Sequence, residues 1–138
     1  MKNIRRSVFE TNSSSMHSLS IIGSSKMHDG KFKNKICLEF DEFGWGYDRL
    51  STPTEKASYL ITEYSDDRNM LGRIVKVFED YTGSAVFIPE INEVDYHANG
   101  YIDHQSQGMI CKFITDDNSI RDLLFDERYS IIIDNDNH

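Results

Sequence analysis

The sequence predicts one small α+β domain spanning residues 1–138, with a mainly antiparallel sheet packed against two to three helices. A chain of 138 residues fits a single domain that can fold without disulfides or a structural metal. Hydrophobic residues make up 38% of the chain, which is enough for a core, and 28% charged residues provide a polar surface. Short apolar runs typical of strands flank two segments of helical periodicity, and this pattern indicates the α+β class.

Polar turns separate the strands expected in the first part of the chain. Ser, Thr and Asn are concentrated over residues 10–18, where their side chains can bond the local backbone, so this stretch is expected to be a loop. Two further loops are expected over 23–30 and 41–47, the second with glycines on both sides of Trp45. The strands between these loops are expected at residues 1–9, 18–22 and 33–40.

Two helices are expected in the middle of the chain. The run Thr52-Pro53-Thr54-Glu55 is a capping box with proline at the first helical position, and it predicts a helix that ends near Tyr64. Asp66 and Asp67 offer a second helix start, and Gly83 is expected to stop that helix. Its apolar residues recur at helical spacing: Met70, Leu71, Ile74, Val75 and Phe78.

The last third of the chain alternates apolar and polar segments. Residues 84–91 are expected to form a strand that lies at a sheet edge or ends at Pro89, because proline cannot donate to a strand ladder. Residues 108–114 are compatible with a helix or a strand. The other expected elements are a polar loop over 95–108, a short helix over 119–125 and a final strand over 129–133.

The expected core draws on one apolar stripe per helix and on the buried positions of the strands. Cys37 and Cys111 lie in apolar segments without a CxxC spacing, so both are expected to be reduced and largely buried. The core residues expected are Ile36, Leu38, Leu60, Leu71, Ile74, Val75, Phe78, Val86, Phe87, Leu123, Leu124 and Ile132.

Charge is distributed unevenly along the chain. The net charge is −8, but residues 1–35 carry +5 and residues 36–138 carry −13. An acidic body repels nucleic acid and is attracted to basic surfaces, including the nucleic-acid grooves of other proteins. Charge alone is also compatible with a solubilising surface. The residues expected to bind a basic partner are Asp66, Asp67, Asp116, Asp117 and Trp45.

The N-terminal loop is a candidate phosphate site. Hydroxyls and arginines bind phosphate, and this loop combines them with His17, a candidate acid–base group. The loop lacks the glycines of a P-loop, and a turn held by Ser and Asn side chains remains an alternative. The residues that would hold phosphate are Arg5, Arg6, Ser13, Ser14 and Ser15.

The loop over 95–106 is a weaker candidate for metal binding or catalysis. Asp95, His97, Asp103 and His104 are residue types that bind Zn²⁺ or Mn²⁺, and a histidine beside a carboxylate can act as a general base. Their spacing matches no specific metal pattern, so a hydrogen-bonded loop or a partner surface is the alternative. We expect neither a resident metal nor a cofactor.

No apolar run approaches the roughly 20 residues needed to cross a bilayer, and no apolar stretch follows the charged N-terminal residues. We therefore expect a cytoplasmic protein without a membrane partner. The acidic charge of residues 36–138 predicts that it has no direct nucleic-acid partner. The sequence leaves open whether the chain forms a homo-oligomer.

Three segments resemble a family of small, uncharacterised phage and prophage proteins of Gram-positive bacteria. They are the opening RSVFETNSSS at 6–15 followed by His17 and Ser18, the stretch GYIDHQS at 100–106, and the ending YSIIIDNDN at 129–137. The resemblance implies a setting in the host bacterial cytoplasm. Small acidic phage proteins in that setting often bind and block a host protein, including CRISPR and other defence complexes.

Three functions follow as hypotheses. The first is an anti-CRISPR-like inhibitor that presents its acidic surface to a basic host protein, such as a nucleic-acid-binding defence effector. The alternative is a nucleotide-binding protein or metal-assisted phosphoesterase that uses the N-terminal Ser/His loop, with His17, His97 or His104 as the acid–base group. The third is a structural or assembly component of a phage.

Overall fold

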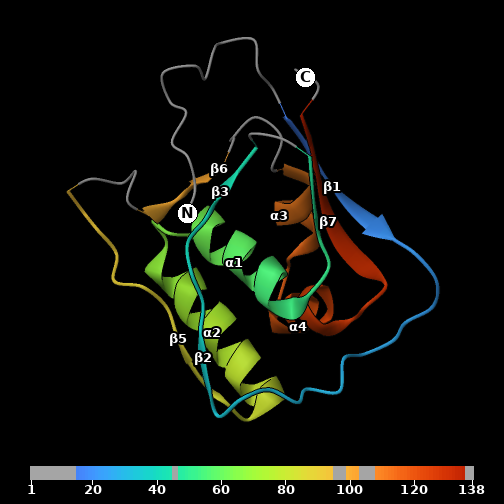
Figure 1. The fold of residues 1–138 in the computed structure, drawn as a ribbon, viewed down its shortest axis with the longest axis horizontal. Helices are drawn as coiled ribbons and strands as arrows, with labels where there is room; N and C mark the ends of the chain where they lie inside the picture. Colours follow the sequence, from blue (N-terminus) through green and yellow to red (C-terminus); the bar gives the residue numbers. More distant parts are fainter. Residues whose placement is uncertain (1–14, 45–46, 95–98, 103–107, 136–138) are drawn as a thin grey trace.

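The computed structural model describes residues 15–44, 47–94, 99–102 and 108–135, and Figure 1 shows how their elements are arranged. The predicted α+β class with a mainly antiparallel sheet is confirmed, although the described residues form four helices rather than two to three. The elements in chain order are β1 (Ser15–Ile21), β2 (Lys35–Cys37), β3 (Glu42–Phe43), β4 (Asp48–Leu50), α1 (Pro53–Glu63), α2 (Arg68–Thr82), β5 (Ala85–Phe87), β6 (Tyr101–Ile102), α3 (Gly108–Phe113), α4 (Asp117–Phe125) and β7 (Tyr129–Asn135).

An antiparallel sheet of order β1-β7-β4 forms one side of the fold. Its register runs from Ser15 opposite Asn135 to Ile21 opposite Tyr129. Side chains alternate between the two faces of a strand, so Ile131 and Ile133 are both fully buried whereas Ile132, between them, is only half-buried. The expectation that Ile132 belongs to the core was therefore wrong by one residue of register.

The capping signals in the sequence set the starts of α1 and α2. The Thr52 hydroxyl accepts from the Glu55 amide at 3.2 Å, and the Glu55 carboxylate accepts from the Thr52 amide at 3.1 Å. Asp67 caps α2 by accepting from the Met70 amide at 3.1 Å. Gly83 ends α2 in the left-handed conformation with φ 73°, which costs glycine little. Both helices agree with the prediction within about one turn.

Two parallel strand pairs were not expected. β2 pairs with β5, and β3 pairs with β6. Each pair joins strands that are far apart in sequence, and α1 and α2 provide the crossover that a parallel connection requires. In Figure 1, α1 lies between the β1–β7 pair on the right and the β2–β5 pair on the left, and α2 overlaps β2 and β5 in this view.

Several element boundaries differ from the prediction. Strand pairing is limited to 35–37 and 85–87, so the strands expected over 33–40 and 84–91 are shorter, and the second ends two residues before Pro89. The expected loops over 41–47 and 95–108 contain the short strands β3 and β6. The ambiguous segment over 108–114 is helical. The strand expected over residues 1–9 lies outside the described residues.

One apolar core holds the sheet and the helices together. Nine of the twelve expected core residues are buried, but Val75 and Ile132 are only partly buried and Phe87 is 50% exposed. Phe87 lies on the outer face of β5, whose burial alternates, and this explains its exposure. Sequence spacing also missed Tyr59 and Phe125, two fully buried aromatic residues.

Cys37 and Cys111 are free thiols, as predicted, but their expected burial was wrong. Cys37 is exposed and Cys111 is half-buried. Cys37 neighbours Ile36 and Leu38 in sequence, but the alternation of β2 directs these two side chains inward and Cys37 outward. Among the described residues, no helix is long and apolar enough to cross a membrane.

Candidate functional site

An acidic pocket of about 330 Å³ opens between the start of α1, β4 and the segment that follows β2. Four carboxylates line it, from Glu39, Asp41, Asp48 and Glu55, and no lysine, arginine or histidine among the described residues does. The remaining lining residues are Cys37, Leu38, Phe43, Leu50, Thr54 and Ser58, of which Leu38, Phe43 and Leu50 are buried. The pocket therefore has an apolar base and an acidic border. We refer to it as the acidic pocket.

Hydrogen bonds hold two of these carboxylates in place. Glu55 Oε1 accepts from the amides of Ser51 and Thr52, each at 3.1 Å. Asp41 Oδ1 accepts from the amide of Glu42 at 2.8 Å. The Ser58 hydroxyl donates to the backbone carbonyl of Glu39 at 2.5 Å, which ties the segment after β2 to α1. The Glu39 side chain is exposed, so its charge is available to a binding partner.

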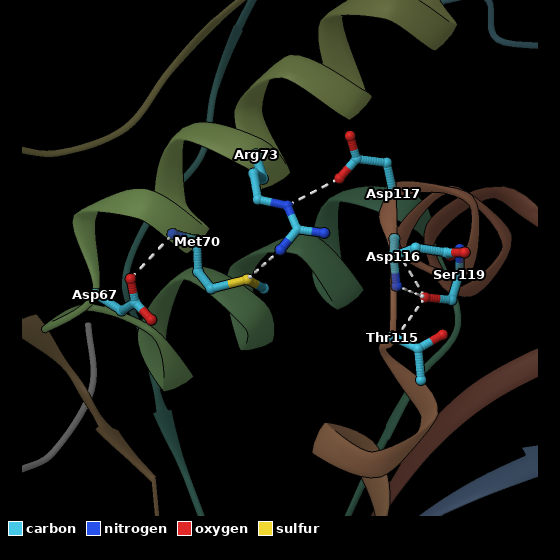
Figure 2. A network of polar contacts seen from close by, with 7 residues as sticks. All are labelled: Asp67, Met70, Arg73, Thr115, Asp116, Asp117 and Ser119. Atoms are coloured by element: carbon cyan, nitrogen blue, oxygen red, sulfur yellow. Dashed lines mark hydrogen bonds and ion pairs between the residues drawn. The ribbon is translucent and has the colours of Figure 1, made fainter.

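The aspartates singled out in the sequence lie at the starts of α2 and α4, where three of the four have structural partners (Figure 2). Asp67 caps α2. Asp116 caps α4 by accepting from the Ser119 amide at 2.9 Å, and Asp117 pairs with Arg73 Nε at 2.9 Å. The ion pair joins α2 to α4. Asp66 is exposed, and its charge acts on the nearby carboxyl of Glu63.

A carboxyl, a thiol and a phenol meet where α1 ends beside α3. The Cys111 thiol lies 3.6 Å from Glu63 Oε2. Burial raises the pKa of Glu63 to about 7. It also raises the pKa values of the Tyr64 hydroxyl and of the Cys111 thiol. Since the thiolate is disfavoured, this arrangement does not activate Cys111 as a nucleophile.

Lys56 is a buried lysine that connects α1 to β7. Its ammonium donates to the Tyr129 carbonyl at 2.9 Å. β4 pairs with residues 131–133 of β7 and does not extend as far as Tyr129. The Lys56 ammonium therefore donates to the Tyr129 carbonyl in place of a backbone amide from a neighbouring strand. Burial lowers the pKa of Lys56 to about 8, and the nearby charges of Asp126 and Glu127 oppose that shift.

His17 lies on the buried face of β1. The His17 side chain is 3% exposed, and its Nδ1 lies 2.7 Å from the hydroxyl of Tyr59. Tyr59 belongs to α1, and its side chain is fully buried. The structure thus gives His17 a place in the core, and its acid–base role stays a prediction. Ser15 begins β1. The other predicted phosphate, metal and aromatic residues lie outside the described residues: Arg5, Arg6, Ser13, Ser14, Trp45, Asp95, His97, Asp103 and His104.

Sequence reasoning missed the acidic pocket because its carboxylates come from three separate segments. The available signal was the acidic content of residues 39–48, which hold Glu39, Asp41, Glu42 and Asp48. Among the described residues, no group of three or more His, Cys, Asp or Glu side chains has the arrangement of a metal site. Comparisons with family models, with curated proteins and with solved structures find no match to this chain.

Proposed function

We propose that this chain is a phage-type accessory factor that binds and inhibits a host protein by placing its acidic surface on a basic groove. The supporting observation is the acidic pocket, where Glu39, Asp41, Asp48 and Glu55 surround a hollow, and the part of the lining that the structure describes includes no basic residue. A lysine or arginine side chain of the partner matches this hollow in charge, and its alkyl stem matches the apolar base.

The charge of the rest of the chain supports the same proposal. Residues 36–138 carry −13, and such a field steers a basic partner toward the surface before contact. Nucleic-acid-binding host proteins expose basic grooves of this kind, so an effector of a bacterial defence complex is the partner class that we propose. No observation on the described residues favours the alternative phosphate or nucleotide function.

The test begins with the full chain immobilised and exposed to a bacterial lysate, with mass spectrometry of the retained proteins. The association rate of the principal retained protein is then measured at several salt concentrations. We expect the rate to fall as salt rises, because the Debye length shortens. Glu39→Lys should slow association by roughly threefold or more, because it reverses a charge beside the pocket without removing a helix cap.

Asp80→Lys is the matched control, since it makes the same change in charge at an exposed position of α2. It should slow association less than Glu39→Lys does. The proposal fails if the retained protein has no basic groove, if association is insensitive to salt, or if the two variants behave alike. Inhibition is tested separately, by the loss of nucleic-acid binding by the partner when the chain is added.

A further inference from the structure

β1 is an edge strand of the β1-β7-β4 sheet. It pairs with β7 along its whole length, from Ser15 to Ile21, and the Ile22 amide extends this ladder by donating to the Arg128 carbonyl at 2.9 Å. Figure 1 shows β1 at the right margin of the sheet, beside β7. Among the described residues no strand pairs with the other long side of β1, which we call the β1 edge.

The bond at Ile22 shows which backbone groups of β1 lie on this edge. In an antiparallel pair, every second residue directs both its N–H and its C=O toward the neighbouring strand. Ile22 is bonded to Arg128, which lies opposite it, so Ser20 also faces β7, whereas Leu19 and Ile21 face away from β7. In the part of the chain that the structure describes, no residue bonds the amide or the carbonyl of Leu19 or of Ile21. Each copy of the chain thus presents two donors and two acceptors on the β1 edge.

The β1 edge lacks the features that commonly protect edge strands from pairing. Such strands carry charged side chains, a proline or a bulge. Residues 15–25 include no Asp, Glu, Lys, Arg or Pro, and the register with β7 is continuous, without a bulge. The end of the strand is also apolar and exposed, since Ile21 is 59% and Ile22 63% exposed. An uncharged, regular edge with exposed apolar side chains favours the addition of another strand.

We propose that the β1 edge pairs with the β1 edge of a second copy of this chain, in antiparallel orientation about a two-fold axis at Ser20. In this register Leu19 of each copy lies opposite Ile21 of the other, and the backbone groups that both residues direct outward bond one another. The Leu19 and Ile21 side chains pack as cross-strand apolar pairs. The two-fold axis repeats every contact, so one pattern on β1 satisfies both copies and joins the two sheets into one.

Charge favours a second copy over a basic partner on this surface. The strand itself has no charged residue, and the described charged residues around it, from β7, α3 and the turns beside Ile22, are three of each sign: Asp134, Lys112, Arg128 paired with Asp126, and Lys26 paired with Glu127. A basic partner is attracted to acidic surfaces and gains no such attraction here. Two chains of net charge −8 repel each other least where their surfaces are uncharged. The inference does not depend on the acidic pocket, which is a different surface.

The test measures self-association of the full chain by sedimentation equilibrium. Pairing of two short strands forms a small interface, so we expect a dimer with a Kd on the order of 10–100 μM. Ile21→Lys should weaken the dimer by roughly tenfold or more, because it places two lysines diagonally across the axis. Val94→Lys is the matched control, since Val94 is 96% exposed and lies outside β1. Both variants change the net charge from −8 to −7, so overall repulsion alone would strengthen the dimer in both.

Amide hydrogen exchange of the unmodified chain tests the geometry without any substitution. The Ser20 amide faces β7 and should be protected at every concentration, whereas the amides of Leu19 and Ile21 should gain protection only as the concentration rises through the Kd. A chain that stays monomeric, or an Ile21→Lys variant that dimerises as well as Val94→Lys, would overturn the inference. Protection of Leu19 and Ile21 in dilute solution would also overturn it, because another part of the same chain would then cover the edge.

Discussion

Glu63 carries its proton to an unusually high pH because burial at the end of α1 raises its pKa from 4.5 to about 7. A carboxyl with a raised folded-state pKa stabilises the fold fully below pH 4.5 and loses this contribution as the pH rises through 7. We predict that the free energy of unfolding falls by about 1–2 kcal/mol over this range, after allowing for solvent screening. Urea unfolding measured at several pH values would show the decline.

The other described groups with shifted pKa values titrate outside this range, and they include Lys56 and Asp126. Lys56 has a lowered pKa, so its contribution is present above pH 10.5 and is lost as the pH falls through 8. Burial alone would raise the pKa of Asp126, but hydrogen bonds from Lys26, Ser25 and Arg128 hold it below 3.8. Glu63→Gln should therefore remove the decline between pH 4.5 and 7, and Asp66→Asn should make it smaller, because the charge of Asp66 helps to raise the pKa of Glu63. A decline that persists in Glu63→Gln would assign it to another residue.

Cys37 and Cys111 should differ in their reaction with a thiol reagent. Cys37 is exposed on the outer face of β2, whereas Cys111 is half-buried and has a raised pKa. In the native protein we expect one fast and one slow labelling phase, and in denaturant two fast phases. Cys37→Ser should abolish the fast native phase, and Cys111→Ser should leave it. Mass spectrometry of partly labelled protein identifies the site, and early labelling of Cys111 would contradict the prediction.

At the scale of elements, the aspartates at the helix starts contribute to stability as well as to charge. Asp67 and Asp116 accept from the amides of Met70 and Ser119, so Asp67→Ala or Asp116→Ala should cost about 1 kcal/mol each. Asp66→Ala, at the exposed position next to the α2 cap, should cost much less. Denaturant midpoints of the three variants provide the measurement. Equal losses at all three positions would show that overall charge, rather than capping, sets the effect.

The helices could be predicted more closely than the strands, because their signals are local. Thr52, Pro53 and Glu55 define the start of α1 within four residues, and Gly83 defines the end of α2. The strands of the β2–β5 and β3–β6 pairs are two or three residues long and find their partners across a large sequence separation. Their propensity is weak over such a length, and only tertiary packing determines the pairing.

The acidic pocket was missed for the same reason. The sequence predicts Glu55 as a capping residue, and Glu55 does cap α1. β4 also places Asp48 in the lining of the same pocket as Glu55, which the sequence does not indicate. β4 was not expected, since Asp48, Arg49 and Leu50 have no alternating pattern long enough to indicate a strand. Conversely, the sequence predicts Asp116 and Asp117 as residues that bind a basic partner. In the structure Asp116 accepts from the Ser119 amide, and Asp117 forms an ion pair with Arg73.

At the scale of the whole molecule, charge and apolar surface are separated. The acidic pocket lies at the start of α1, and a mainly apolar hollow of about 690 Å³ lies between α2 and the segment that includes β5. Because Cys37 and Phe87 are paired between β2 and β5, one residue of each hollow belongs to the same strand pair.

The overall charge leads to the prediction that the chain does not bind DNA or RNA measurably at physiological ionic strength. Nucleic-acid binding is driven by neutralising phosphates with lysine and arginine, and this chain has a net charge of −8. Its basic excess is confined to residues 1–35, and the −13 of residues 36–138 opposes any approach of a phosphate backbone. Fluorescence anisotropy with labelled duplex and single-stranded probes should show no change at physiological salt. Tight, salt-sensitive binding would contradict the proposed function and move the functional surface to Arg5, Arg6 and the lysines within residues 26–35.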